Sequence, residues 1–190
     1  MITRLMGEDN ELLQQFLSSF LCEKDQDIEV FLHERAVNFE DLSKSRTYLV
    51  CDEKELENKP INQVTIYGYI SLALKILHIP ESMSNRMRRE LDGFSAKIHG
   101  EQISDIPCYL IGQLGRNSNV PKESLAGDKL LQYAYDIIAA AVESVGGRYI
   151  MIECKAEAKL IKFYETNGFS EISRGFDKDV LMIQMIRKIS

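Results

Sequence analysis

The chain has 190 residues, of which 45% are hydrophobic and 27% are charged, as in an ordinary globular domain. The net charge of −6 argues against a broadly basic nucleic-acid surface, although it leaves room for a local basic patch. No apolar run approaches the roughly 18 residues of a membrane span, and the polar N-terminus does not resemble a signal peptide. We therefore expect a cytoplasmic protein with no membrane segment.

The cysteines and histidines do not form a ligand pattern. The four cysteines contain no CxxC pair, and the three histidines share no spacing that suits a metal ion. Cys108 and Cys154 fall in apolar stretches that suit core strands. We expect reduced thiols and no metal.

The N-terminal part predicts one strand followed by two helices. Residues 2–6 suit a short strand, and a helix with a wide apolar face follows the turn at 7–9. A second helix begins near Asp25. The apolar positions of the two helices are Leu12, Leu13, Phe16, Leu17, Phe20, Leu21, Ile28, Phe31, Leu32 and Ala36.

Two strands are predicted next, joined by a polar stretch. Residues 47–51 and 64–77 have strand patterns, and residues 52–62, which contain Pro60, suit a hairpin loop. This arrangement predicts an antiparallel pair.

Residues 78–107 separate two predicted core strands by more chain than a bare connection needs, so we expect an insertion with its own structure. A short helix is predicted over 82–91. It carries Arg86, Arg88 and Arg89, the only basic cluster of the chain. Two interpretations remain open: a solvated helix face paired with nearby carboxylates, or a patch that faces phosphate or RNA.

The stretch from residue 108 to residue 169 predicts strand, helix, strand, helix. An apolar stripe at helical spacing follows Ser124, a plausible N-cap, and Gly146 and Gly147 end the helix. Strand, helix, strand at this length predicts a right-handed crossover between parallel strands. The N-terminus of the helix then opens beside the end of the first strand, where backbone N–H groups can hold a phosphate.

Two strands close the chain, over 169–172 and 180–186, with a turn at 174–179. The last strand is strongly apolar, so we expect it to be internal to the sheet or to a homodimer interface. The predicted fold class is α/β (α+β), with a mixed sheet of about seven strands and about four helices. No linker divides the chain, so we expect one domain over 1–190.

The sequence KLIKFYETNGF at 159–169 strongly resembles the last helix of the GCN5-related N-acetyltransferase (GNAT) family. The order FLHERAV, SRTYLVCDE, IYGYISL upstream resembles the first half of the GNAT toxins of bacterial toxin–antitoxin pairs. This resemblance implies a GNAT fold with a sheet splayed between the fourth and fifth strands, and an acetyltransferase that uses acetyl-CoA.

The pyrophosphate loop departs from the family pattern. The family pattern is Gln/Arg-x-x-Gly-x-Gly/Ala, and the matching stretch here begins at Lys122. Gly127 fits the pattern, whereas Leu125 stands where the family has a glycine whose backbone approaches the phosphate. We expect this leucine to weaken coenzyme binding and a glycine in its place to strengthen it.

The resemblance also implies which residues bind the coenzyme. The pantetheine arm pairs with the backbone of the fourth strand, as an added strand would. The pyrophosphate meets N–H groups near the start of the helix, and Asp128 is compatible with an anion there only as a helix cap that points away. The implied coenzyme-binding residues are Gln113, Leu114, Gly115, Lys122, Ser124, Leu125, Ala126, Gly127, Asp128 and Lys155.

Two residues are implied in catalysis. Tyr164 matches the family tyrosine whose hydroxyl reaches the coenzyme sulfur and protonates the leaving thiolate. Glu153, at the end of the preceding strand, is a candidate for accepting the amine proton through water. The alternatives are a tyrosine that only packs and a carboxylate with no role.

The resemblance to toxins suggests the amino group of aminoacyl-tRNA as the acetyl acceptor and a small DNA-binding antitoxin as partner. Two alternatives remain open. One is an acetyltransferase for small molecules or protein amines. The other is a degenerate GNAT domain that binds acyl-CoA weakly and has a regulatory role.

Overall fold

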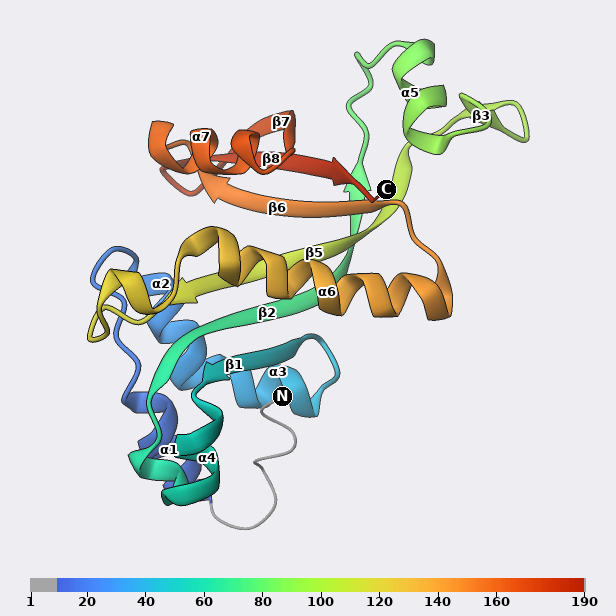
Figure 1. Ribbon diagram of the computed structural model, residues 1–190. Coiled ribbons are helices and arrows are strands. Elements are labelled where there is room, and N and C mark those ends of the chain that lie inside the picture. The colour runs from blue at the N-terminus through green and yellow to red at the C-terminus, as the bar shows by residue number, and fades with distance from the viewer. Residues whose placement is uncertain (1–9, 190) are drawn as a thin grey trace. The chain divides into compact units, whose positions relative to one another are not determined.

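The computed structural model describes residues 10–189, and the strand predicted over residues 2–6 lies outside them. The described residues form both helices and a mixed sheet (Figure 1), which confirms the α/β (α+β) class. The strands form a six-stranded sheet in the order β1-β2-β5-β6-β8-β7 and a separate pair β3-β4. The strands are β1 (Arg46–Cys51), β2 (Ile66–His78), β3 (Lys97–Ile98), β4 (Glu101–Gln102), β5 (Asp105–Arg116), β6 (Tyr149–Lys155), β7 (Ser170–Asp177) and β8 (Val180–Lys188).

The described part of the chain contains more helices than the sequence predicts. The α-helices are α1 (Asn10–Ser18), α2 (Gln26–Val30), α3 (Ala36–Asp41), α4 (Glu53–Asn58), α5 (Asn85–Asp92), α6 (Gly127–Val145) and α7 (Ala158–Thr166). The second predicted helix begins after Asp25, as expected, but a π-helical turn at Phe31–Arg35 separates α2 from α3. None of these helices is long and apolar enough to cross a membrane.

The chain divides into two compact units, and both β2 and β5 contribute to each unit. The first unit contains the described residues up to Ala73 together with Ile111–Glu143, and the second contains Leu74–Leu110 and the chain from Ser144 onward. That the chain forms a single domain, and that its sheet is splayed between the fourth and fifth strands, both remain predictions.

The first unit has a core built from α1, the helices that follow it, and β2. The predicted pair of β1 and β2 is antiparallel, with Thr47 opposite Ser71. The predicted loop between these strands is wrong in part, because Asp52 accepts hydrogen bonds from the N–H groups of Lys54 and Glu55 and starts the short helix α4. The buried core residues are Leu13, Phe16, Leu17, Phe20, Cys22, Phe31, Leu32, Ala36, Val64, Ile66 and Tyr69.

The second unit contains the hairpin of β7 and β8. Asp177 pairs with Val180, so the turn is shorter than the predicted 174–179. Strand β8 lies between β6 and β7, which confirms that it is internal to the sheet. Figure 1 shows β5 and β6 running in the same direction, and β6 is antiparallel to β8, so the sheet is mixed as predicted.

The predicted insertion at 78–107 does have its own structure, with α5 and the β3–β4 hairpin. Ser84 caps α5 by accepting a hydrogen bond from Met87 N, and Gly93 ends the helix with a φ of 85°. Arg88 on this helix is 2% exposed. It therefore belongs to the core of the insertion.

Candidate functional site

The turn between β5 and α6, in the first unit, is the predicted pyrophosphate site. A 3-10 turn at Lys122–Ser124 precedes the helix, so Ser124 is not the N-cap that we predicted. Its N–H donates to Pro121 O, and the first hydrogen bond of α6 runs from Leu130 N to Ala126 O at 3.1 Å. The N–H groups of Gly127 and Asp128 precede that bond, as is typical of an anion-binding helix end.

The side chain of Leu125 points into the protein and not toward the exposed side of this turn, where a phosphate would bind. Its side chain is 3% exposed and lies against Gly68 of β2, in the interior of the first unit. Ala126 and Gly127 beside it are exposed. The bulk of the leucine is therefore directed into the protein, which argues against crowding of a phosphate, and the effect of Leu125 on coenzyme affinity stays a prediction.

Charges of both signs surround the same turn. Lys122 is exposed and supplies a cation. Asp128 lies in the first turn of α6, and its Oδ1 accepts a hydrogen bond from Lys129 N at 3.0 Å, so it is not the helix cap that we predicted. The chemistry of the turn fits a phosphate group held by main-chain N–H groups and one lysine.

Strand β5 carries the three residues predicted to lie along the pantetheine arm. Gln113 and Leu114 are partly buried, whereas Gly115 is buried. A Cβ on Gly115 would lie 2.5 Å from Ile28 Cγ2 and 2.9 Å from Tyr69 Cε1. This glycine therefore lets α2 and β2 pack against β5, and only its main chain is suited to a ligand.

In the second unit, Tyr164 lies on α7 and is 9% exposed. Its ring makes edge-to-face contacts with Phe163 and Phe169, with centroids 5.1 and 5.5 Å apart. The aromatic motif that carries the family resemblance thus packs α7 against the start of β7. Lys155, partly buried at the end of β6, pairs with Met182 of β8.

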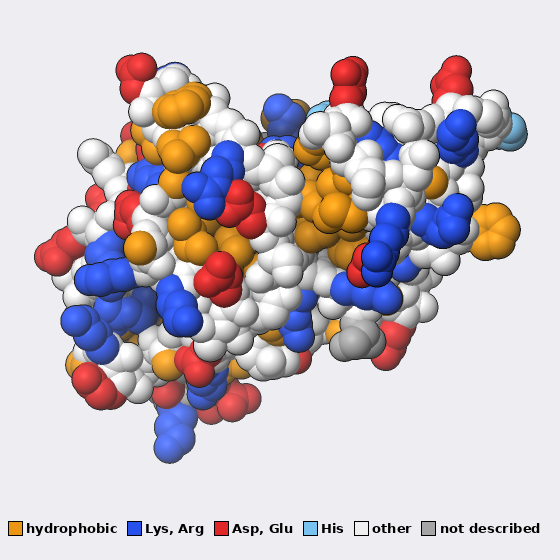
Figure 2. All heavy atoms as spheres, turned by 90° about the horizontal axis from the view of Figure 1, so that it is seen from above, with side chains coloured by type: hydrophobic (Ala, Val, Ile, Leu, Met, Phe, Trp, Pro, Cys, Tyr) orange, Lys and Arg blue, Asp and Glu red, His pale blue; other side chains and the backbone are white. Residues whose placement is uncertain are grey.

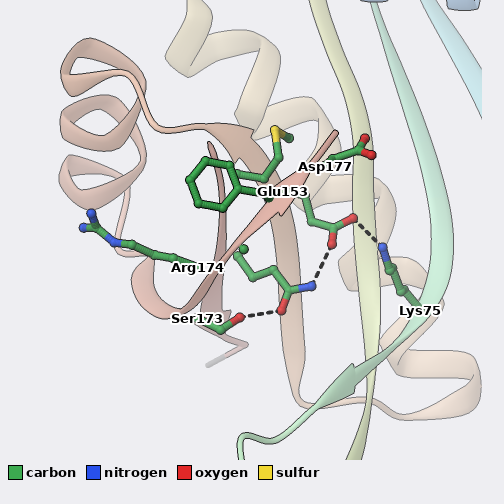
Figure 3. A pocket seen from close by; sticks show the side chains of 9 residues that line it. Lys75, Glu153, Ser173, Arg174 and Asp177 are labelled. Carbon is green, nitrogen blue, oxygen red and sulfur yellow. Dashed lines mark hydrogen bonds and ion pairs between the residues drawn. The ribbon is translucent and has the colours of Figure 1, made fainter. Parts of the chain in front are cut away.

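Glu153 lies on β6 in a polar network that Figure 3 shows. Its Oε2 forms an ion pair with Lys75 Nζ, and its Oε1 accepts a hydrogen bond from Gln184 Nε2 at 2.7 Å. Ser173 Oγ in turn donates to Gln184 Oε1 at 2.6 Å. Partial burial raises the pKa of Glu153, but the hydrogen bonds from Lys75 and Gln184 outweigh it and hold the pKa below its ordinary value.

This network borders a pocket of about 440 Å³ whose walls come from β2, β6, β7 and β8 of the second unit. Of the predicted site residues, Glu153 lines it, whereas Tyr164 and Lys155 do not. Lys75 is a functional candidate that we did not predict. A lysine between Leu74 and Ile76 favours an outward position in the sequence, but in the structure Leu74 and Ile76 are exposed and Lys75 shares the face of the buried Leu77. The lining residues are Lys75, Glu153, Ser173, Arg174, Gly175, Phe176, Asp177, Met182 and Gln184.

The three arginines of α5 do not form one patch. Arg88 donates hydrogen bonds to the carbonyl groups of Pro80, Glu81, Met83 and Ile103. It therefore belongs neither to a solvated helix face nor to a patch that faces RNA. Arg86 and Arg89 are exposed. Figure 2 shows Lys and Arg side chains in several groups over the face that it draws, the most crowded of them at the left, with acidic side chains between the groups.

The described residues contain no group of acidic, histidine or cysteine side chains that suits a metal ion. The cysteines are unpaired. Burial raises the pKa of Cys51 and of Cys108 to about 11, so both thiols are protonated near neutral pH.

No protein-family model matches the chain, and neither does any curated protein sequence. Solved structures do match. AtaT complexed with acetyl-methionyl-tRNA is 20% identical, with a TM-score of 0.62, over 87% of this chain and 85% of that one. A mutant AtaT toxin bound to the C-terminus of the antitoxin AtaR and acetyl-CoA is 17% identical, with a TM-score of 0.61, over 90% and 84%.

A mutant of KacT is 16% identical, with a TM-score of 0.64, over 88% of this chain and 85% of that one. The similarity spans most of each chain and includes both units. The protein therefore has the GNAT fold of the AtaT and KacT toxins, as the resemblance of its sequence predicts.

Proposed function

We propose that this protein is an N-acetyltransferase that moves an acetyl group from acetyl-CoA to the amino group of an aminoacyl-tRNA. The observation that carries the proposal is the similarity, over 87% of the chain, to AtaT complexed with acetyl-methionyl-tRNA. A second AtaT structure contains acetyl-CoA. Together these ligands are the donor of an acetyl group and an acetylated aminoacyl-tRNA.

The turn between β5 and α6 supports acetyl-CoA as the donor. Its helix N-terminus and Lys122 fit a pyrophosphate, and the buried Leu125 leaves the exposed side of the turn to its main chain. The interpretation as a degenerate GNAT domain loses the feature that supported it, since that feature was the bulk of Leu125.

The reaction requires a neutral amine that attacks the thioester carbonyl, so that a C–N bond forms and the C–S bond breaks. The amine gives its surplus proton to water, and the departing thiolate takes a proton from a general acid that water reprotonates. Alignment of the two reactants can lower the barrier by about 7–11 kcal/mol. We assign Tyr164 the role of general acid toward the departing thiolate. Glu153 is a weak base because its pKa lies below the ordinary value, so we assign it a hydrogen-bonding role toward the amine.

Acetylation of an aminoacyl-tRNA would block translation, which suits a toxin that acts in the cytoplasm. AtaT is described as a toxin bound to the C-terminus of an antitoxin, and KacT has been solved in a KacTA–DNA complex. We extend this arrangement to the present protein and propose a DNA-binding antitoxin as its partner.

The test is acetyl transfer by the purified protein from labelled acetyl-CoA to a pool of charged tRNAs, with mass spectrometry of the released amino acids. We expect N-acetylated amino acids from charged tRNA and none from uncharged tRNA. Transfer to free polyamines or protein lysines, with none to charged tRNA, would favour the alternative acceptors. If acetyl-CoA did not raise the melting temperature of the folded protein, the proposal that acetyl-CoA is the donor would be refuted.

A further inference from the structure

Asn117 directly follows β5 and begins the connection to α6, within the first unit. It is 3% exposed, and both ends of its side-chain amide form hydrogen bonds. Nδ2 donates to Ile66 O at 2.7 Å. Oδ1 accepts from Leu21 N at 3.3 Å and from Asn119 N at 2.9 Å. Because donors and acceptors on both sides are matched, this buried amide is held in one orientation.

The main chain at the start of this connection is held by the same neighbours. Asn117 N donates to Tyr67 O at 2.9 Å, and Ser118 N donates to Leu21 O at 2.8 Å. Ser118 Oγ accepts a hydrogen bond from Glu23 N at 3.1 Å. The start of the connection is therefore bound to β2 on one side and to the segment between α1 and α2 on the other.

The far end of the connection is anchored to the same stretch of β2. Leu125 lies against Gly68, the next residue of β2 after the two whose carbonyl groups bind Asn117. The N–H groups of Gly127 and Asp128, which suit a pyrophosphate, come directly after this second anchor. Contacts with three consecutive residues of β2 thus fix both ends of the turn that leads to these N–H groups.

We propose that Asn117 is a positioning residue for the coenzyme, which holds the turn in the conformation that binds the pyrophosphate, and that Ser118 supports it through the segment between α1 and α2. The proposal rests on the proposed function, because it takes this turn as the pyrophosphate site. Asn117 acts through the N–H groups of Gly127 and Asp128 and does not itself bind the coenzyme. A turn without this anchor would be ordered only by the ligand, and that cost lowers affinity.

Two probes separate this role from a general effect on folding, and neither needs catalysis. Coenzyme A contains the pyrophosphate, whereas pantetheine consists of the arm alone and lacks it. We expect Asn117→Ala to weaken the binding of coenzyme A by about tenfold, as is usual when preorganisation is lost, and to leave the binding of pantetheine unchanged. Calorimetry measures the first affinity and ligand-observed NMR the second. A merely structural role would weaken both probes alike.

A control and a second variant accompany Asn117→Ala. Asn119→Ala removes an exposed side chain of the same type from the same turn and keeps the N–H group that Asn117 accepts, so both probes should bind as in the wild type. Ser118→Ala removes the contact with Glu23 N alone. This variant should stay folded, since Ser118 is only partly buried, and should weaken coenzyme A binding by about two- to threefold, with pantetheine unaffected.

Equal weakening of both probes by Asn117→Ala would overturn the proposal, and so would unchanged affinity for coenzyme A. If Asn117→Ala does not fold, the same two outcomes in Ser118→Ala decide. The proposed function fails separately, if no acetyl group reaches charged tRNA. A selective loss of coenzyme A binding without such transfer would retain the role of Asn117 and reject the acceptor. Transfer by the wild type, with variants that bind coenzyme A normally, would do the reverse.

Discussion

Leu125 packs against Gly68 so closely that a Cβ on Gly68 would lie 2.7 Å from Leu125 Cδ2. The same Cβ would lie 2.8 Å from the carbonyl oxygen of Gly115 on the neighbouring strand. The turn that precedes α6 is therefore anchored to the sheet of the first unit by a leucine side chain over a glycine. This contact explains why a leucine is accommodated in a loop whose family pattern has glycine.

The first prediction concerns this contact. Gly68→Ala should lower the free energy of unfolding by about 1–3 kcal/mol, because a methyl group overpacks a site that is closed by main chain on one side. Gly175→Ala is the matched control, since a Cβ there meets nothing within 4 Å. Denaturant unfolding measures both. Equal stability of the two variants would contradict the packing.

The second prediction concerns Leu125 itself. Leu125→Ala should lower the free energy of unfolding by about 2–5 kcal/mol, as is usual for a buried leucine. Coenzyme affinity should not improve, because the side chain that is removed faces the core. Melting temperatures with and without acetyl-CoA give both quantities. If Leu125→Ala or Leu125→Gly bound acetyl-CoA more tightly than the wild type, the leucine side chain would hinder the coenzyme, as the sequence predicts.

The third prediction concerns Arg88. Arg88→Met should lower the free energy of unfolding by at least about 3 kcal/mol, because buried carbonyl groups lose a charged donor. The exposed Arg89→Met should change it by no more than about 0.5 kcal/mol. A similar effect of the two changes, measured by denaturant unfolding, would show that the carbonyl contacts of Arg88 contribute little.

The fourth prediction concerns tRNA binding. If the remaining basic residues of α5 face RNA, the double change Arg86→Gln and Arg89→Gln should weaken tRNA binding and reduce the slope of its salt dependence by about 2. The double change Lys24→Gln and Lys44→Gln removes the same charge from exposed positions elsewhere. Identical salt slopes for the two double variants would remove α5 from the interface.

The fifth prediction concerns the pH dependence of stability. The pKa of Glu153 in the folded protein lies below its ordinary value of 4.5, so its carboxylate stabilises the fold above that pH and stops doing so as the pH falls through the folded pKa. Wild type should therefore exceed Glu153→Gln in stability at pH 7, and the difference should shrink below about pH 4.5. The exposed Glu143→Gln is the control. A difference that stays constant with pH would contradict the network with Lys75.

Strong periodic patterns are the part of this fold that the sequence predicts well. The apolar stripe of α6, the glycines that end it and the apolar strands beside it need no tertiary information, because each follows from local conformational preference and burial of one face. The helix α4 was missed because its polar composition hides it, although the capping position of Asp52 was readable.

The candidate site was less predictable because it depends on which way side chains point. Leu125 faces inward only because Gly68 leaves space for it, and Arg88 is buried only because carbonyl groups from two segments, residues 80–83 and Ile103, converge on it. The residues that contact Leu125 and Arg88 do not follow from any regular spacing in the sequence, so these contacts could not be predicted from it. The ion pair of Lys75 and Glu153 likewise joins residues 78 positions apart.

The last prediction concerns Tyr164, whose role in catalysis is implied by family resemblance and whose ring has a packing role in the structure. Tyr164→Phe keeps the contacts of the ring with Phe163 and Phe169, so the melting temperature should barely change. If the hydroxyl protonates the leaving thiolate, turnover should fall by roughly 10²–10⁴-fold, while the Michaelis constant for acetyl-CoA changes little.

The matched control is Tyr133→Phe on α6, which also removes one hydroxyl group from a partly buried ring and should leave turnover unchanged. Because a coenzyme thiolate is a moderate leaving group near neutral pH, the fall could approach the lower end of that range. A fall of only about twofold, with equal melting curves, would give Tyr164 a packing role alone and leave alignment of the reactants to account for catalysis.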